Sequence, residues 1–225
     1  MGNFSDVTEK NETSESNFCV IAIYVTVPLL FCYWILEVHY FLRFLLCAFM
    51  AKFFKRRLYI LDETTYSGIC LTTDVDTLLF HMNNTRYLRE VDFARADFYV
   101  RTRLWNEIRK KGGSVAQICT NIRYRRFIRP FTFYTITTKV MHWDHNTIFM
   151  EHRFITNNNG FVNAIVMSRQ RLIDCSAEDV MSELLYIQNK NSEVSLTKPD
   201  LPLEYVRWVE CNDISSANLR SINDK

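Results

Sequence analysis

The hydrophobic pattern of the chain begins with an apolar run, from Phe18 to Leu36, that contains no charged residue. In a helical conformation its nineteen residues would extend about 28 Å, close to the thickness of the hydrocarbon core of a bilayer. A cleaved signal peptide is the competing interpretation, but the run is long, its leader is acidic and no small-residue cleavage site follows it. The pattern therefore predicts a retained transmembrane signal anchor over residues 18–36.

The sequence on either side of this run predicts its orientation. Residues 1–17 are polar, as in disordered segments, and contain N-glycosylation sequons at Asn3 and Asn11. Only Lys10 is basic before the run, whereas basic residues soon follow it, at Arg43, Lys52, Lys55, Arg56 and Arg57. By the positive-inside rule the rest of the chain faces the cytosol, and we expect anchoring in the endoplasmic reticulum membrane. Cleavage of the run would instead place the protein in the secretory pathway.

A second apolar segment, residues 37–57, carries more charge than the first. It is rich in Phe and Leu between Phe41 and Phe54, and it ends in the basic cluster of residues 55–57. This composition favours a juxtamembrane helix that lies in the membrane interface, with the basic cluster against anionic headgroups.

Beyond this segment the pattern becomes that of a globular domain, predicted over residues 58–190. Stretches rich in Ile, Val, Thr, Phe and Tyr alternate loosely with polar residues, which predicts β-strands. Turn sequences, such as those at residues 144–146 and 157–160, separate them. The expected strands are residues 66–71, 114–125, 131–143, 147–156 and 161–173.

Two segments of this domain have helical periodicity. Apolar side chains share one helical face at four positions, Tyr87, Val91, Ala94 and Phe98. Lysines followed by glycines at 110–113 are a stop signal, so one long helix is predicted to end there. Residues 176–188 predict a second helix with Ser176 as its N-cap. Residues 191–225 predict a linker and an amphipathic tail that packs on the domain.

The loop before the long helix contains the candidate chemistry. Its acids, Asp74 and Asp76, precede an apolar Leu-Leu-Phe and then His81. Asn83 and Asn84 follow at the helix start, where an Asn side chain commonly accepts a free backbone N–H. Such N–H groups, with the partial positive charge of a helix N-terminus, suit a phosphate or a carbonyl that becomes an oxyanion.

Composition excludes several classes of protein. The net charge of +2 does not indicate nucleic-acid binding. With only five glycines, the chain contains no dinucleotide turn, Walker loop or nucleophile elbow. Its seven cysteines are scattered and never in C-x-x-C spacing, which argues against a disulfide framework and a zinc site. His142, His145 and His152 have no supporting carboxylate spacing, so we expect no metal and no cofactor.

The segment His81–Arg95, HMNNTRYLREVDFAR, resembles a motif of membrane-associated relatives of the 4-hydroxybenzoyl-CoA thioesterase group. The likeness covers roughly residues 71–216 and includes Arg129-Pro130-Phe131. The predicted elements follow the order of a hotdog fold: a strand, a loop, one long helix and four further strands. The resemblance therefore implies an α+β fold, an antiparallel sheet wrapped round one long helix, preceded here by the transmembrane helix.

The resemblance also implies a site. Hotdog domains of this kind usually form homodimers and hold an acyl-CoA thioester at the dimer interface, near the helix N-terminus. In active members an Asp of the preceding loop acts as nucleophile or general base, and backbone N–H groups polarise the thioester carbonyl. On this sequence Asp76 is the first candidate and Asp74 the second, with His81 beside them and Asn83 and Asn84 at the oxyanion position.

The loop departs from the pattern of active relatives, in which the acid commonly lies four residues before the histidine and a glycine directly precedes the histidine. Here Asp76 lies five residues and Asp74 seven residues before His81, and Phe80 replaces the glycine. Both aspartates could instead bond the backbone, as in Asx turns. His81 could equally be a structural histidine that bonds the backbone.

A basic strand end is formed by Arg123, Arg125, Arg126 and Arg129. These arginines could bind the phosphates of CoA through charge-assisted hydrogen bonds, or they could be an edge that deters strand pairing. Two functions stay open. The first is a thioesterase that acts on fatty acyl-CoA at the membrane, and the second is a catalytically inactive hotdog module that binds a lipid ligand or a protein partner.

Overall fold

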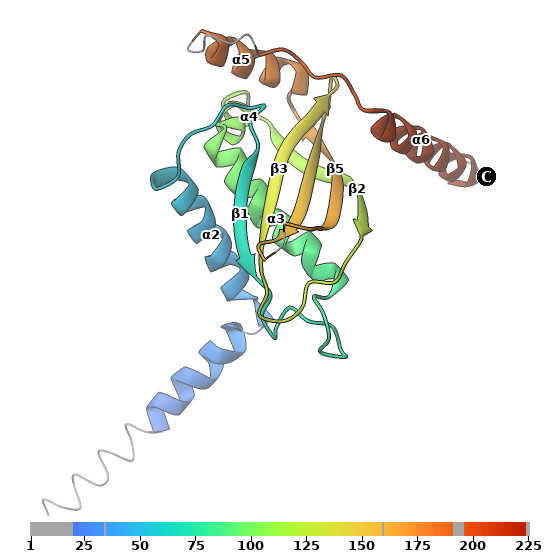
Figure 1. Cartoon of the computed structure of the whole chain (residues 1–225). Helices are drawn as coiled ribbons and strands as arrows, with labels where there is room; N and C mark the ends of the chain where they lie inside the picture. The colour runs from blue at the N-terminus through green and yellow to red at the C-terminus, as the bar shows by residue number, and fades with distance from the viewer. Residues whose placement is uncertain (1–19, 34, 159, 191–195, 224–225) are drawn as a thin grey trace, which may run out of the picture. The chain divides into compact units, whose positions relative to one another are not determined.

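The computed structural model describes residues 20–33, 35–158, 160–190 and 196–223 (Figure 1). The chain divides into two compact units, one ending at Leu46 and the other beginning at Cys47. The predicted disordered tail, with its two sequons, lies outside the described residues, as do residues 191–195 of the predicted linker.

The apolar N-terminal sequence forms two helices, the second of which lies within the predicted juxtamembrane segment of residues 37–57. A helix over Val20–Tyr33 is followed by α2 (Val38–Phe53), and the chain turns at Glu37, where φ is 47°. Among the described helices no single one is long and apolar enough to cross a bilayer, but these two pass that test together, with a 67° bend between them. The predicted single spanning helix over residues 18–36 is therefore not confirmed.

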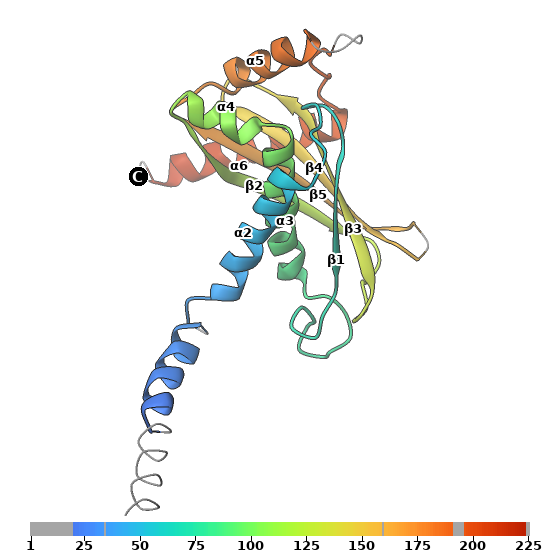
Figure 2. The same ribbon diagram turned by 90° about the vertical axis from the view of Figure 1, so that its left-hand side faces the viewer.

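The second unit contains a five-stranded antiparallel sheet in the order β1-β3-β4-β5-β2. All five predicted strands are confirmed with ends that differ by a few residues: β1 (Thr64–Ile69), β2 (Ser114–Tyr124), β3 (Phe133–Trp143), β4 (Thr147–Thr156) and β5 (Val162–Ile173). The helix α3 (Asn84–Arg101) runs along one face of this sheet (Figures 1 and 2). A curved antiparallel sheet in this order around one central helix is the hotdog arrangement, as predicted.

The predicted long helix is broken. It ends at Arg101, and a separate helix, α4 (Leu104–Lys110), follows after a turn. Thr102 Oγ1 donates to Phe98 O at 2.7 Å, and Arg103 adopts a left-handed conformation with φ of 64°. The turn allows Leu104 and Ile108 to enter the core, which a straight continuation of α3 would not. The sequence did not reveal this because helical propensity and stop signals are unchanged across the break.

The basic cluster after α2 contacts the C-terminal end of α3. Lys55 Nζ lies 2.6 Å from Asp97 Oδ1, and the Asp97 side chain is fully buried. Arg57 donates to Val100 O, and Arg101 donates to Arg56 O at 3.0 Å. Cations at the carboxyl end of a helix also interact favourably with its dipole. In this unit Lys55 and Arg57 therefore hold the chain against α3, a role that differs from the predicted contact with headgroups.

The second predicted helix, α5 (Ala177–Asn189), is confirmed together with its cap, because Asp179 N donates to Ser176 Oγ at 3.2 Å. The predicted tail forms α6 (Leu203–Asn223). Its first turns pack on the sheet: Tyr205 is fully buried and makes an edge contact with Phe149 of β4, with ring centroids 6.2 Å apart. Asn212 also contacts the sheet, accepting from Cys119 Sγ of β2 at 3.5 Å, and from Asp213 onward the described part of α6 is exposed.

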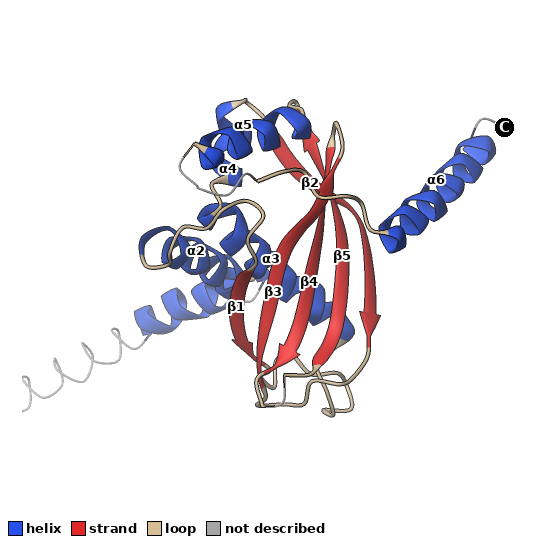
Figure 3. Ribbon diagram, turned by 45° about the horizontal axis from the view of Figure 1, so that its top comes forward, coloured by secondary structure: helices blue, strands red, loops and turns tan. Residues whose placement is uncertain are grey.

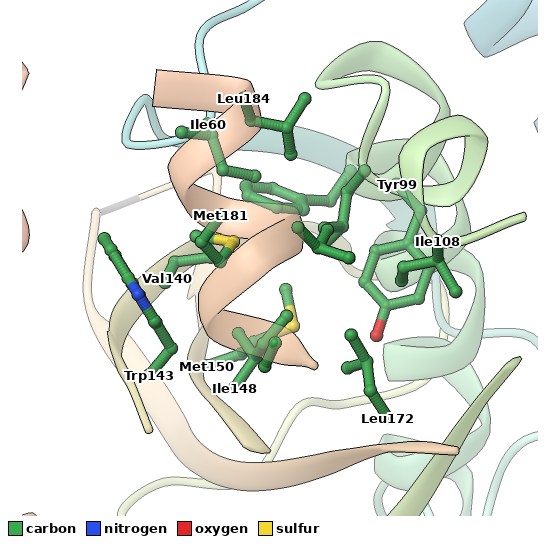
Figure 4. Close-up of a cluster of buried hydrophobic side chains, with 14 residues drawn as sticks. Ile60, Tyr99, Ile108, Val140, Trp143, Ile148, Met150, Leu172, Met181 and Leu184 are labelled. Carbon is green, nitrogen blue, oxygen red and sulfur yellow. The ribbon is translucent and has the colours of Figure 1, made fainter. Parts of the chain in front are cut away.

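Two hydrophobic clusters fill the space between α3 and the sheet. One, the α5-side cluster, joins Phe98 of α3 to side chains of α4, α5 and the sheet. Figure 4 shows Met181 and Leu184 of α5 in this cluster, beside Val140 and Trp143 of β3. The other, the loop-side cluster, surrounds the first half of α3 and consists of Cys70, Met82, Tyr87, Val91, Ala94, Ile128, Tyr134, Ile136, Phe154, Ala164 and Val166.

A row of buried polar side chains separates the two clusters. His152 is fully buried, with Thr138 Oγ1 2.9 Å from its Nδ1 and Ser168 Oγ 3.2 Å from its Nε2. Gln170 extends the row by donating to Ser168 Oγ at 3.2 Å and to Gln117 Oε1 at 3.1 Å. The hydrogen bonds satisfy groups that would otherwise be costly to bury.

Candidate functional site

The loop before α3 is closed by its own backbone. Asp76 N donates to His81 O at 2.9 Å, and Leu79 N donates to Asp76 O at 3.0 Å. Val75 and Met82 form an isolated antiparallel bridge just outside this turn. Leu79 has a positive φ of 55°, which a bulky residue rarely adopts. The loop is therefore a specific tight turn that leads directly into the helix.

Asp76 uses its carboxylate to hold this turn. Its Oδ1 accepts from Phe80 N at 3.0 Å and from His81 N at 3.4 Å. These backbone N–H groups, that of Phe80 above all, stabilise the charged form and lower the pKa of Asp76 below its usual value of 3.8. Asp76 is therefore ionised at neutral pH, and at least one of its oxygens is engaged with the loop.

Asp74 is almost completely buried and shapes the preceding turn. Its Oδ2 accepts from Leu71 N at 2.9 Å, and its backbone O accepts from Asn83 N at 2.8 Å. Arg86 Nε lies 3.8 Å from Asp74 Oδ1, and the same guanidinium donates to Thr73 O at 2.8 Å. Asp74 therefore bonds the backbone of its own loop, although not in the i to i+2 pattern of an Asx turn, and its catalytic role stays a prediction.

His81 is half-buried beside the turn. Its Nδ1 lies 2.9 Å from Met82 O, and because a carbonyl only accepts, Nδ1 carries the hydrogen. In the neutral ring Nε2 then has the free lone pair. The imidazole stacks on Phe127, with centroids 4.1 Å apart and planes 8° apart. His81 is thus fixed in orientation by the backbone, as the structural interpretation expects, and it retains one basic nitrogen.

The N-terminus of α3 provides a backbone donor. Asn83 is the N-cap, as predicted: its Oδ1 accepts from Thr85 N at 2.9 Å. Met82 N and Asn83 N also donate within the domain, to Ile128 O and Asp74 O. Asn84 N has no acceptor among the described residues. This N–H, at the positive end of the helix dipole, is the candidate donor to an oxyanion or a phosphate.

The four predicted arginines lie at the same end of the domain. Figure 3 shows the loops before α3, between β2 and β3, and between β4 and β5 together at one end of the sheet. All four side chains are exposed. The guanidinium groups of Arg125 and Arg126 lie over the Phe161 ring, 5.0 and 4.2 Å from its centroid. The fold therefore brings the arginine group and the Asp-His loop to the same end of the domain. The sequence alone did not predict this, because the two segments are far apart along the chain.

Sequence reasoning missed three residues that position this site. Phe127 stacks on His81, Arg86 pairs with Asp74, and Tyr124 OH donates to Asn84 O at 2.9 Å. Arg86 lies within the quoted motif and could have been proposed as a partner for the loop acids. Phe127 and Tyr124 come from another strand end, and no local pattern in the sequence relates them to α3.

A cleft of about 620 Å³ lies at the opposite end of the sheet, where its lining includes Ile118, Arg171 and Cys175. It contains none of the predicted site residues. The candidate chemistry is instead at a solvent-facing corner of this single chain, close to the edge strand β2. Among the described residues, no three His, Cys, Asp or Glu side chains form a group that could hold a metal.

The fold and this corner define a hotdog domain of the thioesterase type, and the comparisons agree. A family model described as the thioesterase-like superfamily matches residues 70–208. Protein THEM6 of Drosophila melanogaster is 39% identical over 194 residues, covering 86% of this chain and 96% of that protein. Protein THEM6 of Xenopus laevis is 37% identical over 187 residues, covering 83% of this chain and 86% of that protein.

This chain belongs to the thioesterase-like superfamily. Among solved structures it is similar to the probable thioesterase YbaW from Escherichia coli, with a TM-score of 0.49 and 21% sequence identity. That match covers 55% of this chain and 95% of YbaW.

Proposed function

We propose that this protein binds a fatty acyl-CoA thioester at the N-terminal end of α3 and hydrolyses it. The observation that carries the proposal is the free N–H of Asn84, next to Asp76 and His81, in a chain of the thioesterase-like superfamily. The thioester carbonyl would accept from this N–H, and the exposed arginines Arg123, Arg125, Arg126 and Arg129 would contact the CoA phosphates.

The chemistry requires a base or a nucleophile beside that carbonyl. Asp76 is ionised at neutral pH and could take a proton from water as the water attacks, or attack the carbonyl itself. His81 Nε2 is the other basic atom at the corner. The positive helix end and Asn84 N–H would stabilise the oxyanion, and the CoA thiolate would be the leaving group.

The second candidate function is binding without hydrolysis, and the loop geometry favours it. Asp76 Oδ1 is held by two backbone N–H groups, and a carboxylate with a lowered pKa is a weaker base. Phe80 occupies the position of the glycine found in active relatives. A module of this kind would present a bound acyl-CoA or lipid, or would serve as a scaffold for a protein partner.

We further propose a homodimer held at the membrane. β2 is an edge strand with Ile118 exposed, and pairing of this edge with a second copy would enclose the open corner. Light scattering of the detergent-solubilised full chain should give the mass of a dimer, and a monomer would contradict an interface site. Protease treatment of sealed microsomes should digest the domain and protect residues 1–17 if the domain faces the cytosol of the endoplasmic reticulum.

Turnover and affinity of the purified full chain for a panel of acyl-CoAs test the proposed function. Asp76→Asn keeps an oxygen that accepts from Phe80 N but removes the base, so it should lower turnover about 100- to 10,000-fold with binding retained. Asp74→Asn is the matched control and should cost less. If Asp76→Asn is as active as the parent chain, the catalytic assignment fails. Binding with no turnover supports the second candidate, and neither binding nor turnover leaves only the scaffold role.

A further inference from the structure

The end of the domain that carries the candidate site exposes an unusual number of large apolar side chains. In the turn before α3, Leu78 is 82% exposed, and Leu79 and Phe80 are also exposed. Three aromatic side chains from the β2–β3 connection and the start of β3 are exposed in the same way: Phe127, Phe131 and Phe133. Single exposed apolar residues need no explanation, but a contiguous group of this size indicates an interaction surface.

The two loops meet at Phe80 and Phe127, and their exposed apolar side chains are together named the apolar end: Leu78, Leu79, Phe80, Phe127, Phe131 and Phe133. The Phe80 and Phe127 ring centroids are 6.4 Å apart and meet edge to face. Backbone hydrogen bonds hold the loops together, from Met82 N to Ile128 O at 2.8 Å and from Phe131 N to Cys70 O at 2.7 Å. The apolar side chains are therefore presented by a braced framework and are not the result of a loose loop.

Positive charge gathers at the same end of the domain, beside the apolar end. The exposed arginines Arg123, Arg125, Arg126 and Arg129 lie in or beside the β2–β3 connection. The two nearby acids do not cancel them, because Asp74 pairs with Arg86 and the single negative charge of Asp76 faces four arginines. Exposed Leu and Phe next to a group of arginines match the layers of a membrane interface, where acyl chains lie beneath anionic phosphates.

We propose that the apolar end docks on an anionic lipid surface, with Leu78, Leu79 and Phe131 entering the interface and the arginines on lipid phosphates. A second copy of the chain is the less suitable occupant. A two-fold contact through this face would bring eight arginines, four from each copy, to one interface, and like charges gathered in this way disfavour association. A lipid surface carries the opposite charge and accepts all of the exposed side chains at once.

Docking in this way would give the candidate site an orientation. The turn at residues 76–81 leads directly into α3, so the free Asn84 N–H would lie just above the lipid headgroups. An acyl chain could then pass between the bilayer and the site without crossing water. This inference rests on the membrane association proposed above, but it requires neither hydrolysis nor a particular acyl-CoA.

Quenching of tryptophan fluorescence by brominated lipids tests the docking. The full chain is placed in nanodiscs of phosphatidylcholine with phosphatidylserine. Leu78→Trp is compared with Tyr186→Trp, a position that is also well exposed, at 69%, but lies on α5 at the opposite end. Brominated acyl chains should reduce the added fluorescence of Leu78→Trp at least about twofold and leave that of Tyr186→Trp unchanged. No quenching at residue 78, or equal quenching at both positions, would overturn the proposal.

A charge variant separates lipid docking from other occupants. Arg125→Gln/Arg126→Gln/Arg129→Gln should weaken the quenching of Leu78→Trp in anionic nanodiscs, whereas Arg207→Gln/Arg220→Gln on exposed α6 should not. Unquenched tryptophan together with loss of the dimer in Leu78→Asp would assign the surface to a contact between copies. If the chain stays in the nanodiscs but its tryptophan at residue 78 is not quenched, the docking proposal is rejected and the membrane anchor is not. If the chain never associates with the nanodiscs, the proposed anchor is rejected as well.

Discussion

The two ends of α3 are built differently. At its carboxyl end Asp97 is fully buried between Lys55 and Arg101, and the α5-side cluster covers the helix. At its amino end a cap and a braced turn leave Leu78 and the Asn84 N–H facing outward. Burial and ion pairing make the first end a source of stability. The second end leaves apolar side chains exposed and so lacks the stabilisation that their burial would give. Such exposure is typical of surfaces that bind a ligand or a partner.

The largest expected effect comes from breaking the buried charge cluster at the carboxyl end. Asp97 Oδ1 lies 2.6 Å from Lys55 Nζ and Oδ2 lies 3.2 Å from Arg101 NH1. Asp97→Ala leaves two cations without their partner and should lower the free energy of unfolding by about 3–5 kcal/mol. Urea denaturation of the detergent-solubilised chain measures this loss. Glu210→Ala, which removes the exposed partner of Arg207, should cost less than about 1 kcal/mol.

His152, between the two clusters, should make the stability depend on pH. Burial, with the nearby Arg95 charge, lowers the pKa of His152 from 6.5 to about 3. Below pH 6.5 His152 is therefore protonated in the unfolded chain but stays neutral in the folded chain. The free energy of unfolding falls as the pH falls. From pH 6.5 to 4.5 this one group should remove about 2–3 kcal/mol.

His152→Gln tests that pH dependence with the hydrogen-bonding positions largely kept. Denaturation midpoints of both chains are measured from pH 7 down to pH 4.5. The variant should be less stable near neutrality but should lose less stability on acidification. Equal slopes in the two chains would show that His152 is not the group responsible.

The strands were predictable from their β-branched and aromatic composition between turn sequences. Alternation of burial is clear in β5, whereas β4 is buried at almost every position and β2 contains no buried residue. The caps at Asn83 and Ser176 were predictable for the same local reason. The break at Thr102 and Arg103 was not, because it depends on how Leu104 and Ile108 fit a core made by distant strands. The turn at Glu37, by contrast, falls at the boundary between the two apolar segments, where Glu37 is the first charged residue after Phe18.

The candidate site was predictable only in part. The motif located Asp74, Asp76, His81 and the helix start, but it did not reveal that both carboxylates bond the backbone of their own loop. Those bonds depend on the detailed path of a turn in which Leu79 has a positive φ. The stacking of Phe127 on His81 joins segments about forty-six residues apart. Such contacts follow from the tertiary fold and leave no local pattern.

The N-caps at the two ends of the domain allow a comparison with a smaller expected loss of stability, in which only one cap should affect ligand binding. Asn83→Ala and Ser176→Ala each remove a side-chain acceptor at a helix start and should each cost about 1 kcal/mol. Only Asn83→Ala should also weaken acyl-CoA binding, because this cap sets the direction of the adjacent Asn84 N–H. Denaturation and ligand titration of both variants measure the two effects. Equal loss of binding in Ser176→Ala would remove the special role of the α3 start.

The smallest effect on stability is expected at the apolar end itself. Leu78 is 82% exposed, so Leu78→Ala removes almost no buried surface and should change the free energy of unfolding by less than about 0.5 kcal/mol. The same truncation at Leu184, which is 2% exposed in the α5-side cluster, should cost about 2–5 kcal/mol. Urea titration of both variants in detergent compares them directly. A loss above 1 kcal/mol for Leu78→Ala would mean that this side chain is buried within the protein, for example against a second copy, and is not available to a lipid surface.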